Sequence, residues 1–394
     1  MKRIIIHHIG LSKTSPFLSG GEKAELEIIE FLGNHQRTDN YIYTSESGET
    51  LYKQLKRLPP NSFIRIGSIK WEKISLIFAY YLRILECPLR LRKFPNSAIN
   101  IIFSHEEFLP TILYSFLEKL LNPSSKWIFF YHMKAPSLFR GFKGEFTNTL
   151  HIPSLRLIRY IVEQQIAFLL TKSVDVVITV NEYYRSFLEE KYPQNKVYVL
   201  KSYGGVSVPD IKVAKQYDAV WMGRFHTQKG ILELIDIVER VVSVKRNFRV
   251  VVLGGGNKRI ERKILKLVRA KNLDSNIFFK GFITGDEKYR ILKMAKVFLM
   301  TSYFESFGQV IIEAMKCGLP TIAYSLPTFS FLGDTIIKVS ILDNLAFAER
   351  IIDLIISDDY YFQVQKKVLA ASQGYSWAKT GKEISNLIEK LSRC

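Results

Sequence analysis

Short apolar runs separated by helix-like patterns recur along the whole chain, and this alternation constrains the fold more than any other feature. Runs such as VDVVITV (174–180) and RVVVLGG (249–255) are rich in valine and do not alternate with polar residues, which indicates strands buried on both faces of a parallel sheet. Helical patterns such as GILELIDIVERVVSV (230–244) lie between them. The repeated order predicts an α/β fold with helices on both faces of each sheet. The strand candidates are 3–9, 62–67, 99–104, 126–132, 174–180, 196–201, 217–223, 249–255, 276–282, 296–302 and 319–325.

The segment SYGGVSVPDIKVAKQ (202–216) interrupts this alternation with two glycines and a proline. A length of 394 residues suits two domains that each bury a core. We therefore expect an N-terminal α/β domain at 1–203, a linker at 204–216 and a C-terminal α/β domain at 217–374. We expect a last helix at 375–394 that returns towards the N-terminal domain.

The net charge of +19 predicts anionic partners such as nucleotides, polyphosphates, nucleic acid or an acidic membrane. Cys87, Cys317 and Cys394 are far apart and form no C-x-x-C pair, which argues against a disulfide framework or a zinc site and suits a reducing compartment. The N-terminus has no signal-peptide core, and the longest apolar run, 74–82, is shorter than the roughly 18 residues of a membrane span. We expect a cytoplasmic protein that either stays in solution or rests on the inner face of a membrane.

The stretch TSYFESFGQVIIEAMKCGLP (301–320) carries two glutamates around a predicted strand-to-helix crossing. Ligands of open α/β sheets bind at the carboxyl ends of strands, and the free N–H groups of the next helix attract anions. Gly308 leaves room for a ligand, while Glu305 and Glu313 can accept hydrogen bonds from two sets of sugar hydroxyls. A second interpretation is that Glu305 only caps the helix and that Glu313 is solvated on its outer face.

The stretch WMGRFHTQKG (221–230) places two cations after another predicted strand. Arg224 and Lys229 beside a helix start can neutralise a leaving diphosphate, the role that Mg²⁺ has in other transferases. Because the chain contains 56 Lys and Arg residues, both can instead be ordinary surface cations.

Two stretches of the first half carry weaker signals. LSGGEKAE (18–25) contains Gly20 and Gly21, and such a pair suits the close approach of the backbone to an anion, or a plain turn. FFYHMKAP (129–136) ends a predicted strand at His132, which is either catalytic or structural.

The triple glycine of LGGGNKR (253–259) does not complete a dinucleotide-binding fingerprint, because Arg259 occupies the sixth position and Phe278 and Phe279 lie about 20 positions after it. The chain also contains no D-x-D pair, no H-E-x-x-H and no G-K-[ST] motif. We therefore expect no metal site, no cofactor and no Walker-type phosphate loop.

Taken together, these motifs resemble the GT-B retaining glycosyltransferases of family four. The shared elements, in order, are the N-terminal glycine pair, G-R-x4-K-G, G-F after a strand, and E-x7-E followed by C-G-L-P. The similarity is strongest over 217–325 and continuous but weaker over 1–200. It implies two Rossmann-like domains that face a cleft, with a nucleoside-diphosphate sugar held mainly by the second.

Carried over position by position, the resemblance assigns roles to residues of both domains. Arg224 and Lys229 would bind the donor diphosphate, Glu305 would contact the donor sugar, and Glu313 would hold the ribose hydroxyls. The other implied contacts are the backbone at Ser306, Phe307 and Gly308 near the sugar, Phe282 and Ile283 near the base, Gly20 and Gly21 on the phosphates, and His132 facing the reacting sugar.

The implied reaction is the metal-independent transfer of a sugar, with retention, from a nucleoside-diphosphate sugar to a hydroxyl of a glycan or a lipid-linked acceptor, as in cell-surface polysaccharide or glycolipid synthesis. The stretch from Trp71 to Lys93 mixes an apolar run with Arg83, Arg90 and Arg92. This composition suits docking on an acidic membrane, or a buried core helix followed by a solvated basic loop.

Two other classes remain open at this point. A nucleotide-sugar epimerase of GT-B shape would change the donor without needing an acceptor. A basic nucleic-acid-binding protein is suggested by charge alone, and the chain carries no RRM, KH or zinc-finger signature. We expect a nucleotide sugar, and not nucleic acid, as the partner.

Overall fold

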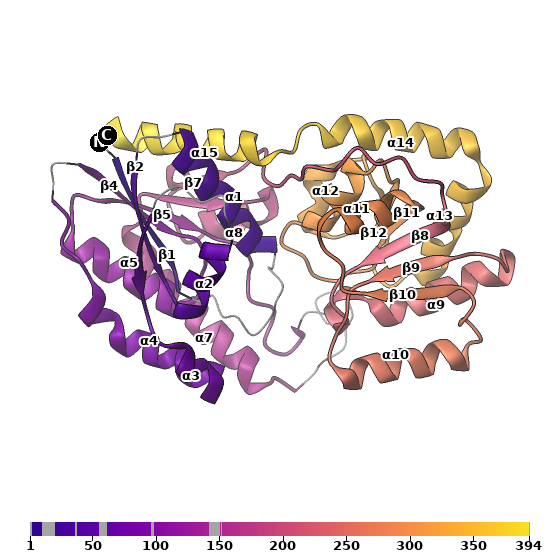
Figure 1. The fold of residues 1–394 in the computed structure, drawn as a ribbon, viewed down its shortest axis with the longest axis horizontal. Coiled ribbons are helices and arrows are strands. Elements are labelled where there is room, and N and C mark those ends of the chain that lie inside the picture. Colours follow the sequence, from indigo (N-terminus) through magenta and orange to yellow (C-terminus); the bar gives the residue numbers. More distant parts are fainter. Residues whose placement is uncertain are drawn as a thin grey trace. The chain divides into compact units, whose positions relative to one another are not determined.

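A computed structural model of the protein describes residues 2–9, 20–35, 38–54, 61–95, 98–141, 150 and 152–393. The chain divides into two compact units. One is built from Met1–Leu138, Ile152–Tyr203 and Trp377–Cys394, and the other from Phe139–His151 and Gly204–Ser376. Each unit contains a parallel sheet covered by helices (Figure 1), so the predicted α/β class is confirmed.

The first unit contains a seven-stranded parallel sheet in the order β3-β2-β1-β4-β5-β6-β7. Its strands are β1 (Lys2–His8), β2 (Thr38–Thr44), β3 (Asn61–Arg65), β4 (Ile99–Ser104), β5 (Lys126–Phe130), β6 (Val176–Thr179) and β7 (Val197–Val199). Its helices are α1 (Gly20–His35), α2 (Glu46–Gln54), α3 (Ile69–Ile74), α4 (Leu76–Arg90), α5 (Leu109–Leu121), α7 (Leu155–Leu170), α8 (Glu182–Glu189) and α15 (Trp377–Arg393).

The core of the first unit lies between its sheet and helices α4, α5, α7 and α8. Large aromatic side chains fill it, among them Tyr43, Trp127 and Phe129, which are fully buried. The last helix, α15, packs against α1 and comes so close that a Cβ atom on Gly381 would lie 2.2 Å from Cγ of Phe31. The C-terminal helix therefore belongs to the first unit.

The second unit contains a six-stranded parallel sheet in the order β10-β9-β8-β11-β12-β13. Its strands are β8 (Tyr217–Met222), β9 (Val250–Leu253), β10 (Ile277–Gly281), β11 (Ala295–Met300), β12 (Thr321–Tyr324) and β13 (Ile337–Val339). Its helices are α9 (Ile231–Val244), α10 (Lys258–Ala270), α11 (Gly285–Lys293), α12 (Gln309–Lys316), α13 (Asn344–Ile356) and α14 (Asp358–Ser372).

Helical spacing of apolar residues explains how α9 covers this sheet. Ile231, Leu234 and Val238 recur on one face and are buried against the strands together with residues of α10 and α13. The next helix, α10, is capped by Asn257, whose side chain accepts hydrogen bonds from the first turn. Figure 1 shows α9 and α10 on one side of the sheet and α11 and α12 on the other.

The predicted strands are all present, but the structure contains two more. β2 has the sequence TDNYIYT, in which polar residues interrupt the apolar run that marks the other strands. β13 is only three residues long. Both were missed because uninterrupted apolar runs were the signal used to find strands.

No helix within the described ranges combines the length and the apolar character that crossing a membrane requires.

A buried histidine couples the stability of the first unit to pH. His7, at the carboxyl end of β1, is fully buried, and its Nδ1 atom lies 2.9 Å from Oγ of Ser115. Burial lowers the pKa of His7 from 6.5 to about 3, because the imidazolium form would lose its hydration.

We expect acid to destabilise the protein through His7. Its folded-state pKa lies below the unfolded value, so only the unfolded state binds this proton between pH 6.5 and pH 3, and stability falls as the pH is lowered through that window. Between pH 6.5 and pH 5 the loss amounts to about 2 kcal/mol. His7→Asn, which keeps a polar group near Ser115, should flatten this dependence in denaturant titrations at a series of pH values. An unchanged slope would show that His7 does not contribute.

Candidate functional site

The candidate site lies at the carboxyl edge of the second sheet, where the strand order reverses. β8 is the first strand of this unit and pairs with β9 on one side and with β11 on the other. The loops that leave β8 and β11, at 223–230 and 301–308, therefore start side by side. In doubly wound folds, ligands bind at this point of reversal.

Hydrogen bonds join the two loops. Trp221 Nε1–H donates to the Thr301 hydroxyl over 3.0 Å, and that hydroxyl donates to the carbonyl of Gly230 over 2.8 Å. The amide of Tyr303 donates to the carbonyl of Gln228 over 2.9 Å. Gly230 has a φ of +68°, and a Cβ atom there would lie 1.9 Å from the carbonyl oxygen of Thr301. The two backbones thus touch, and only glycine fits at position 230.

This frame brings a cation and a carboxylate together. Nζ of Lys229 lies 2.5 Å from Oε1 of Glu305, and the two side chains are 20% and 11% exposed. The alternative in which Glu305 caps the following helix is wrong, because α12 is capped by Gly308 and no side chain accepts from its first turn. Glu305 instead neutralises Lys229.

Arg224 lies on the same loop and is exposed to solvent. Its side chain forms no hydrogen bond or ion pair with the part of the chain that the structure describes. His226, between the two cations, has a pKa below its usual value because of burial and, next, the positive charges of Arg224 and Lys229. The loop after β8 is therefore a positively charged segment with one cation open to a ligand.

The start of α12 presents backbone N–H groups beside this segment. Gly308 adopts a φ of +81°, and a Cβ atom there would lie 2.9 Å from the Phe329 ring. Phe307 is buried and stacks on Phe331 with a centroid distance of 4.7 Å, while Ser306 is partly exposed. The positive end of the helix dipole thus faces the same edge of the sheet as Arg224 and Lys229.

Glu313 lies within α12 and is not solvated, so the alternative that placed it on the outer face is wrong. Its Oε2 atom is 2.9 Å from Nζ of Lys288 on α11, and the side chains of Glu313 and Lys288 are 6% and 15% exposed. Lys288 could not be predicted from sequence patterns, because α11 and α12 meet only through the tertiary fold.

Phe282 and Ile283 follow β10, and Phe282 is 46% exposed. The strand ends of β8, β9 and β10 are tied by backbone hydrogen bonds from Gly223 to Leu253 and from Gly254 to Gly281, at 3.0 and 2.8 Å. The triple glycine thus forms the turn between β9 and α10 beside the site.

Gly20, Gly21 and His132 all belong to the first unit. The two glycines begin α1, which follows β1. His132 follows β5, where its Nε2–H donates to the carbonyl of His105 over 2.7 Å and its ring stacks on Phe130.

A buried carboxyl group lies next to this histidine. The backbone N–H of His132 lies 3.4 Å from Oε2 of Glu107, and the Tyr160 hydroxyl donates to Oε1. Burial raises the pKa of Glu107 to about 7. Glu107 was not among the predicted site residues, although the histidine and glutamates of SHEEF (104–108) directly after a strand would have been a usable signal.

The structure thus gathers the predicted residues of the second unit at one edge of its sheet. Lys229 and Glu305 are in direct contact, Arg224 shares the loop of Lys229, and Glu313 lies on the helix that follows Glu305. Ser306, Phe307 and Gly308 directly precede that helix, while Phe282 and Ile283 directly follow β10, which lies two positions from β8. His226 and Lys288 are the additions from the structure. Across the described residues, no group of three or more His, Cys, Asp or Glu side chains is placed to hold a metal ion.

Comparison with solved structures identifies the class of fold. The protein HepE from Anabaena, solved in complex with UDP-glucose, superposes with a TM-score of 0.72 at 14% identity over 99% of this chain and 100% of that one. Sucrose-phosphate synthase from Thermosynechococcus elongatus superposes with a TM-score of 0.73 at 17% identity over 99% of both chains. The protein has the GT-B fold, as the sequence resemblance implied.

Sequence comparison finds a similarity to one family of enzymes in the second unit. Residues 210–361 match the family model of glycosyl transferases group 1. A D-inositol 3-phosphate glycosyltransferase of Corynebacterium efficiens is 27% identical over 179 residues, 44% of this chain and 42% of that relative. A serotype-specific mannosyltransferase, WbdA, of Escherichia coli is 30% identical over 128 residues, 31% of this chain and 15% of that relative. These alignments span less than two thirds of the relatives' own length. The second unit of this chain is therefore similar to the glycosyl transferases group 1.

Gly230→Ala is expected to destabilise the protein more than Gly285→Ala. Both glycines have positive φ angles, +68° and +62°. Alanine tolerates this left-handed conformation poorly, so each substitution should lower the free energy of unfolding by about 1 to 2 kcal/mol. Only at Gly230 does the new Cβ atom meet backbone, while at Gly285 no described atom lies within 4 Å. The overpacking at Gly230 should add about 2 kcal/mol in denaturant titrations. Equal losses would contradict the close contact between the two loops.

Proposed function

We propose that this protein is a retaining glycosyltransferase that moves a sugar from a nucleoside-diphosphate sugar to a hydroxyl group of a glycan or a lipid-linked acceptor. The observation that carries the proposal is the contact between Lys229 and Glu305 within two joined loops at the strand reversal. Lys229 can bind a phosphate and Glu305 can bind sugar hydroxyls, and the two side chains are close enough to contact one nucleotide-sugar molecule. The names of the relatives, which include glycosyltransferases and a mannosyltransferase, and the UDP-glucose bound to HepE support a nucleotide sugar as donor.

In this proposal the diphosphate binds between Arg224, Lys229 and the start of α12. Phosphate oxygens accept hydrogen bonds from the two side chains and from the amides of the helix start, which are held in place before the substrate arrives. When the donor binds, a phosphate oxygen replaces Glu305 as the acceptor for Lys229. The hydroxyl groups of the donor sugar then donate hydrogen bonds to Glu305 in place of Lys229. These fixed charges take the part that a divalent ion has in other transferases.

The transfer itself breaks the bond between the anomeric carbon and the diphosphate oxygen, and forms a bond between that carbon and the acceptor oxygen on the same face. Negative charge develops on the leaving diphosphate, where Arg224, Lys229 and the helix dipole stabilise it. The proton of the acceptor hydroxyl passes to the departing phosphate. The roles of Gly20, Gly21 and His132 of the first unit, and of Phe282 and Ile283 at the base, remain predictions from the resemblance.

An exposed apolar surface on the first unit supports placing this reaction at a membrane. It consists of Ile74, Ile77, Phe78, Tyr81, Leu85 and Leu89, which recur with helical spacing and are exposed, and we call it the α4 surface. Leu85 and Leu89 are 73% and 81% exposed. A row of exposed apolar side chains of this length indicates an interaction site. α4 thus buries one face, at Ala79, Arg83 and Cys87, as the alternative of a core helix requires, and exposes its other face.

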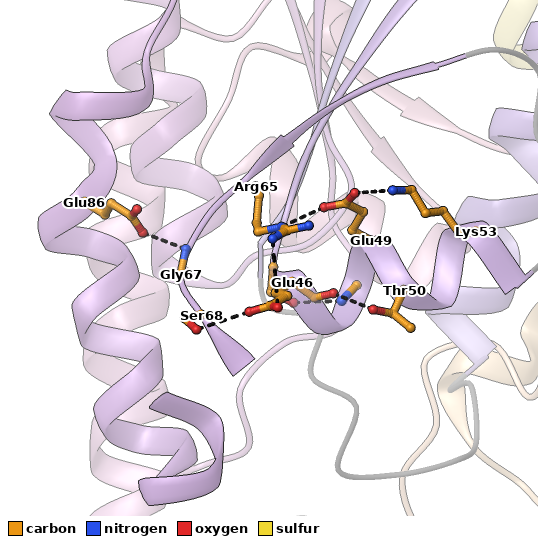
Figure 2. Close-up of polar contacts among 10 residues, drawn as sticks. Glu46, Glu49, Thr50, Lys53, Arg65, Gly67, Ser68 and Glu86 are labelled. Carbon is orange, nitrogen blue, oxygen red and sulfur yellow. Dashed lines mark hydrogen bonds and ion pairs between the residues drawn. The ribbon is translucent and has the colours of Figure 1, made fainter. Parts of the chain in front are cut away.

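The acidic residues near the α4 surface are bonded inside the protein. Glu72 is buried in an ion pair with Arg83, and Arg83 also donates to the carbonyl of Ile9 over 2.9 Å. Arg83 is thus not one of the exposed cations with which the sequence analysis grouped it. Glu86 accepts a hydrogen bond from the N–H of Gly67 over 2.6 Å (Figure 2).

The cations around the α4 surface remain exposed. Lys70, Lys73, Arg92 and Lys93 are exposed and form no ion pair with any residue in the described ranges. Apolar side chains bordered by cations match the interface of an anionic bilayer. We propose that the protein associates with the inner face of a membrane through the α4 surface, where a lipid-linked acceptor would be present.

The transfer is tested by incubating the protein with UDP-, GDP- and ADP-sugars, with and without acceptor glycans. We expect one donor to be consumed only when an acceptor is present, and to raise the melting temperature. Arg224→Ala should lower kcat/KM about a hundredfold, because one charge contact to the leaving group is lost. Arg246→Ala, which removes another exposed arginine of the second unit, is the matched control.

Three outcomes would contradict the proposal. Unchanged turnover in both Arg224→Ala and Glu305→Ala would reject the site. A change of the donor's stereochemistry without an acceptor would indicate an epimerase, and salt-sensitive RNA binding without donor turnover would indicate a nucleic-acid-binding protein.

Flotation with vesicles tests the membrane contact. The protein should float with vesicles that contain phosphatidylglycerol and less with phosphatidylcholine alone. Leu85→Glu with Leu89→Glu should weaken binding about tenfold or more, since two exposed apolar side chains no longer insert. Ile356→Glu replaces an apolar residue of the second unit that is 72% exposed and should have no effect. Concentration-dependent dimers without flotation would show that a second copy covers the α4 surface instead.

A further inference from the structure

The carboxylate of Glu313 is almost completely withdrawn from water, and a lysine from another helix is bonded to it. Glu313 lies in the middle of α12, with its side chain 6% exposed, and Nζ of Lys288 on α11 lies 2.9 Å from its Oε2 atom. The two residues are separated in the chain by β11 and the loop that contains Glu305. The ion pair therefore joins two helices that flank the same strand.

A buried carboxylate needs this compensation. Removing an ionised group from water costs several kcal/mol unless a charge or hydrogen-bond partner replaces the lost hydration. Lys288 is itself held in place, because its Nζ atom lies 4.5 Å from the centroid of the Tyr289 ring, and its side chain is only 15% exposed. Both members of the pair are thus restrained, and the carboxylate has a defined orientation in the protein without a ligand.

A fixed orientation matters for the hydroxyl groups that Glu313 is proposed to hold. A carboxylate can accept about four hydrogen bonds over its two oxygens, so it can hold ribose hydroxyls while it stays bonded to Lys288. A carboxylate that is already oriented loses little conformational freedom when a ribose binds, and this increases the affinity.

We propose that Lys288 is a positioning residue that orients the Glu313 carboxylate towards the ribose hydroxyls, and that this ion pair makes the protein select ribonucleotides over deoxyribonucleotides. The inference rests on the proposed function, because it assumes that a nucleoside diphosphate binds at this edge of the sheet. It adds a residue outside the sequence motifs, and it assigns Lys288 a part in specificity and none in the chemical step.

The second Lys–Glu pair of the site provides a contrast. Lys229 lies on the loop after β8 beside Arg224, where the diphosphate is proposed to bind, whereas Lys288 lies on α11. Loss of Lys229 should weaken ribo- and deoxyribonucleotides equally, since both carry the same diphosphate. Loss of Lys288 should act mainly on the nucleotides that carry both ribose hydroxyls.

The test compares matched nucleotides by isothermal titration calorimetry on the full chain. UDP, GDP and ADP are each measured beside their 2′-deoxy and 3′-deoxy forms, and the base that binds best is used for the variants. The protein should bind the ribonucleotide with an affinity about tenfold or more above that of at least one deoxy form. This ratio corresponds to the loss of one hydrogen bond to a charged acceptor. In Lys288→Met this preference should fall to about twofold or less, and Lys288→Arg should restore most of it, because arginine also donates to a carboxylate.

Two controls separate positioning from structure. Lys271→Met removes another lysine of the second unit that is ion-paired, to Glu239, and should leave the preference unchanged. Lys229→Met should lower all affinities and keep their ratio. Thermal melts report the stability of every variant, so a loss of folding in Lys288→Met would be visible and Lys288→Arg would then carry the comparison.

The outcomes distinguish this inference from the proposed function. If the protein prefers ribonucleotides and Lys288→Met keeps that preference while losing only stability, Lys288 is structural and the inference is wrong. If Lys288→Arg loses the preference as Lys288→Met does while remaining folded, orientation by a cation is not the cause. If none of the three nucleoside diphosphates binds, the proposed function itself is wrong, and the inference is wrong with it.

Discussion

The candidate site depends on the contact between the backbones after β8 and β11. At Gly230 the chain passes so close to Thr301 that no side chain fits, and the Thr301 hydroxyl accepts from Trp221 while donating to Gly230. β8 and β11 are not consecutive in the chain and become neighbours where the strand order reverses. The contact between Gly230 and Thr301 therefore sets the distance between the loops that follow these two strands. Lys229 and Glu305 can face each other only because Gly230 and Thr301 hold their loops together.

In the proposed function, two Lys–Glu pairs divide the binding of a donor between them. The pair of Lys229 and Glu305 lies on loops at the edge of the sheet, so a ligand that carries both a phosphate and hydroxyl groups can replace it with equivalent bonds. The pair of Lys288 and Glu313 joins two helices and is more deeply buried. An exchangeable pair suits the reacting end of a nucleotide sugar, and a permanent pair suits the nucleoside end, which is released unchanged.

In the first unit, acidic side chains near α4 are bonded to other groups of the protein and not placed for a ligand. Its acids near α4 are used inside the protein, Glu72 against Arg83 and Glu86 against the backbone of Gly67, so that the outer face keeps apolar side chains and cations. The positive charge that makes up the net charge of +19 is thus not evenly distributed over the surface. An exposed apolar row raises the risk of aggregation unless it has a partner, which is the physical reason to look for a membrane or a second protein there.

The sequence alone determined the α/β class, most of the strands and the two loops of the site, because buried parallel strands need uninterrupted apolar runs and anion-binding loops need glycine and cations at fixed spacing. It missed β2, whose polar residues hide the strand pattern, and it could not place Arg83, Glu313 or Lys288. Only the tertiary structure decided that Arg83 is buried, that α4 exposes its apolar row and that Lys288 meets Glu313. Each of these depends on which helix faces meet, and that is set by segments far apart in the chain.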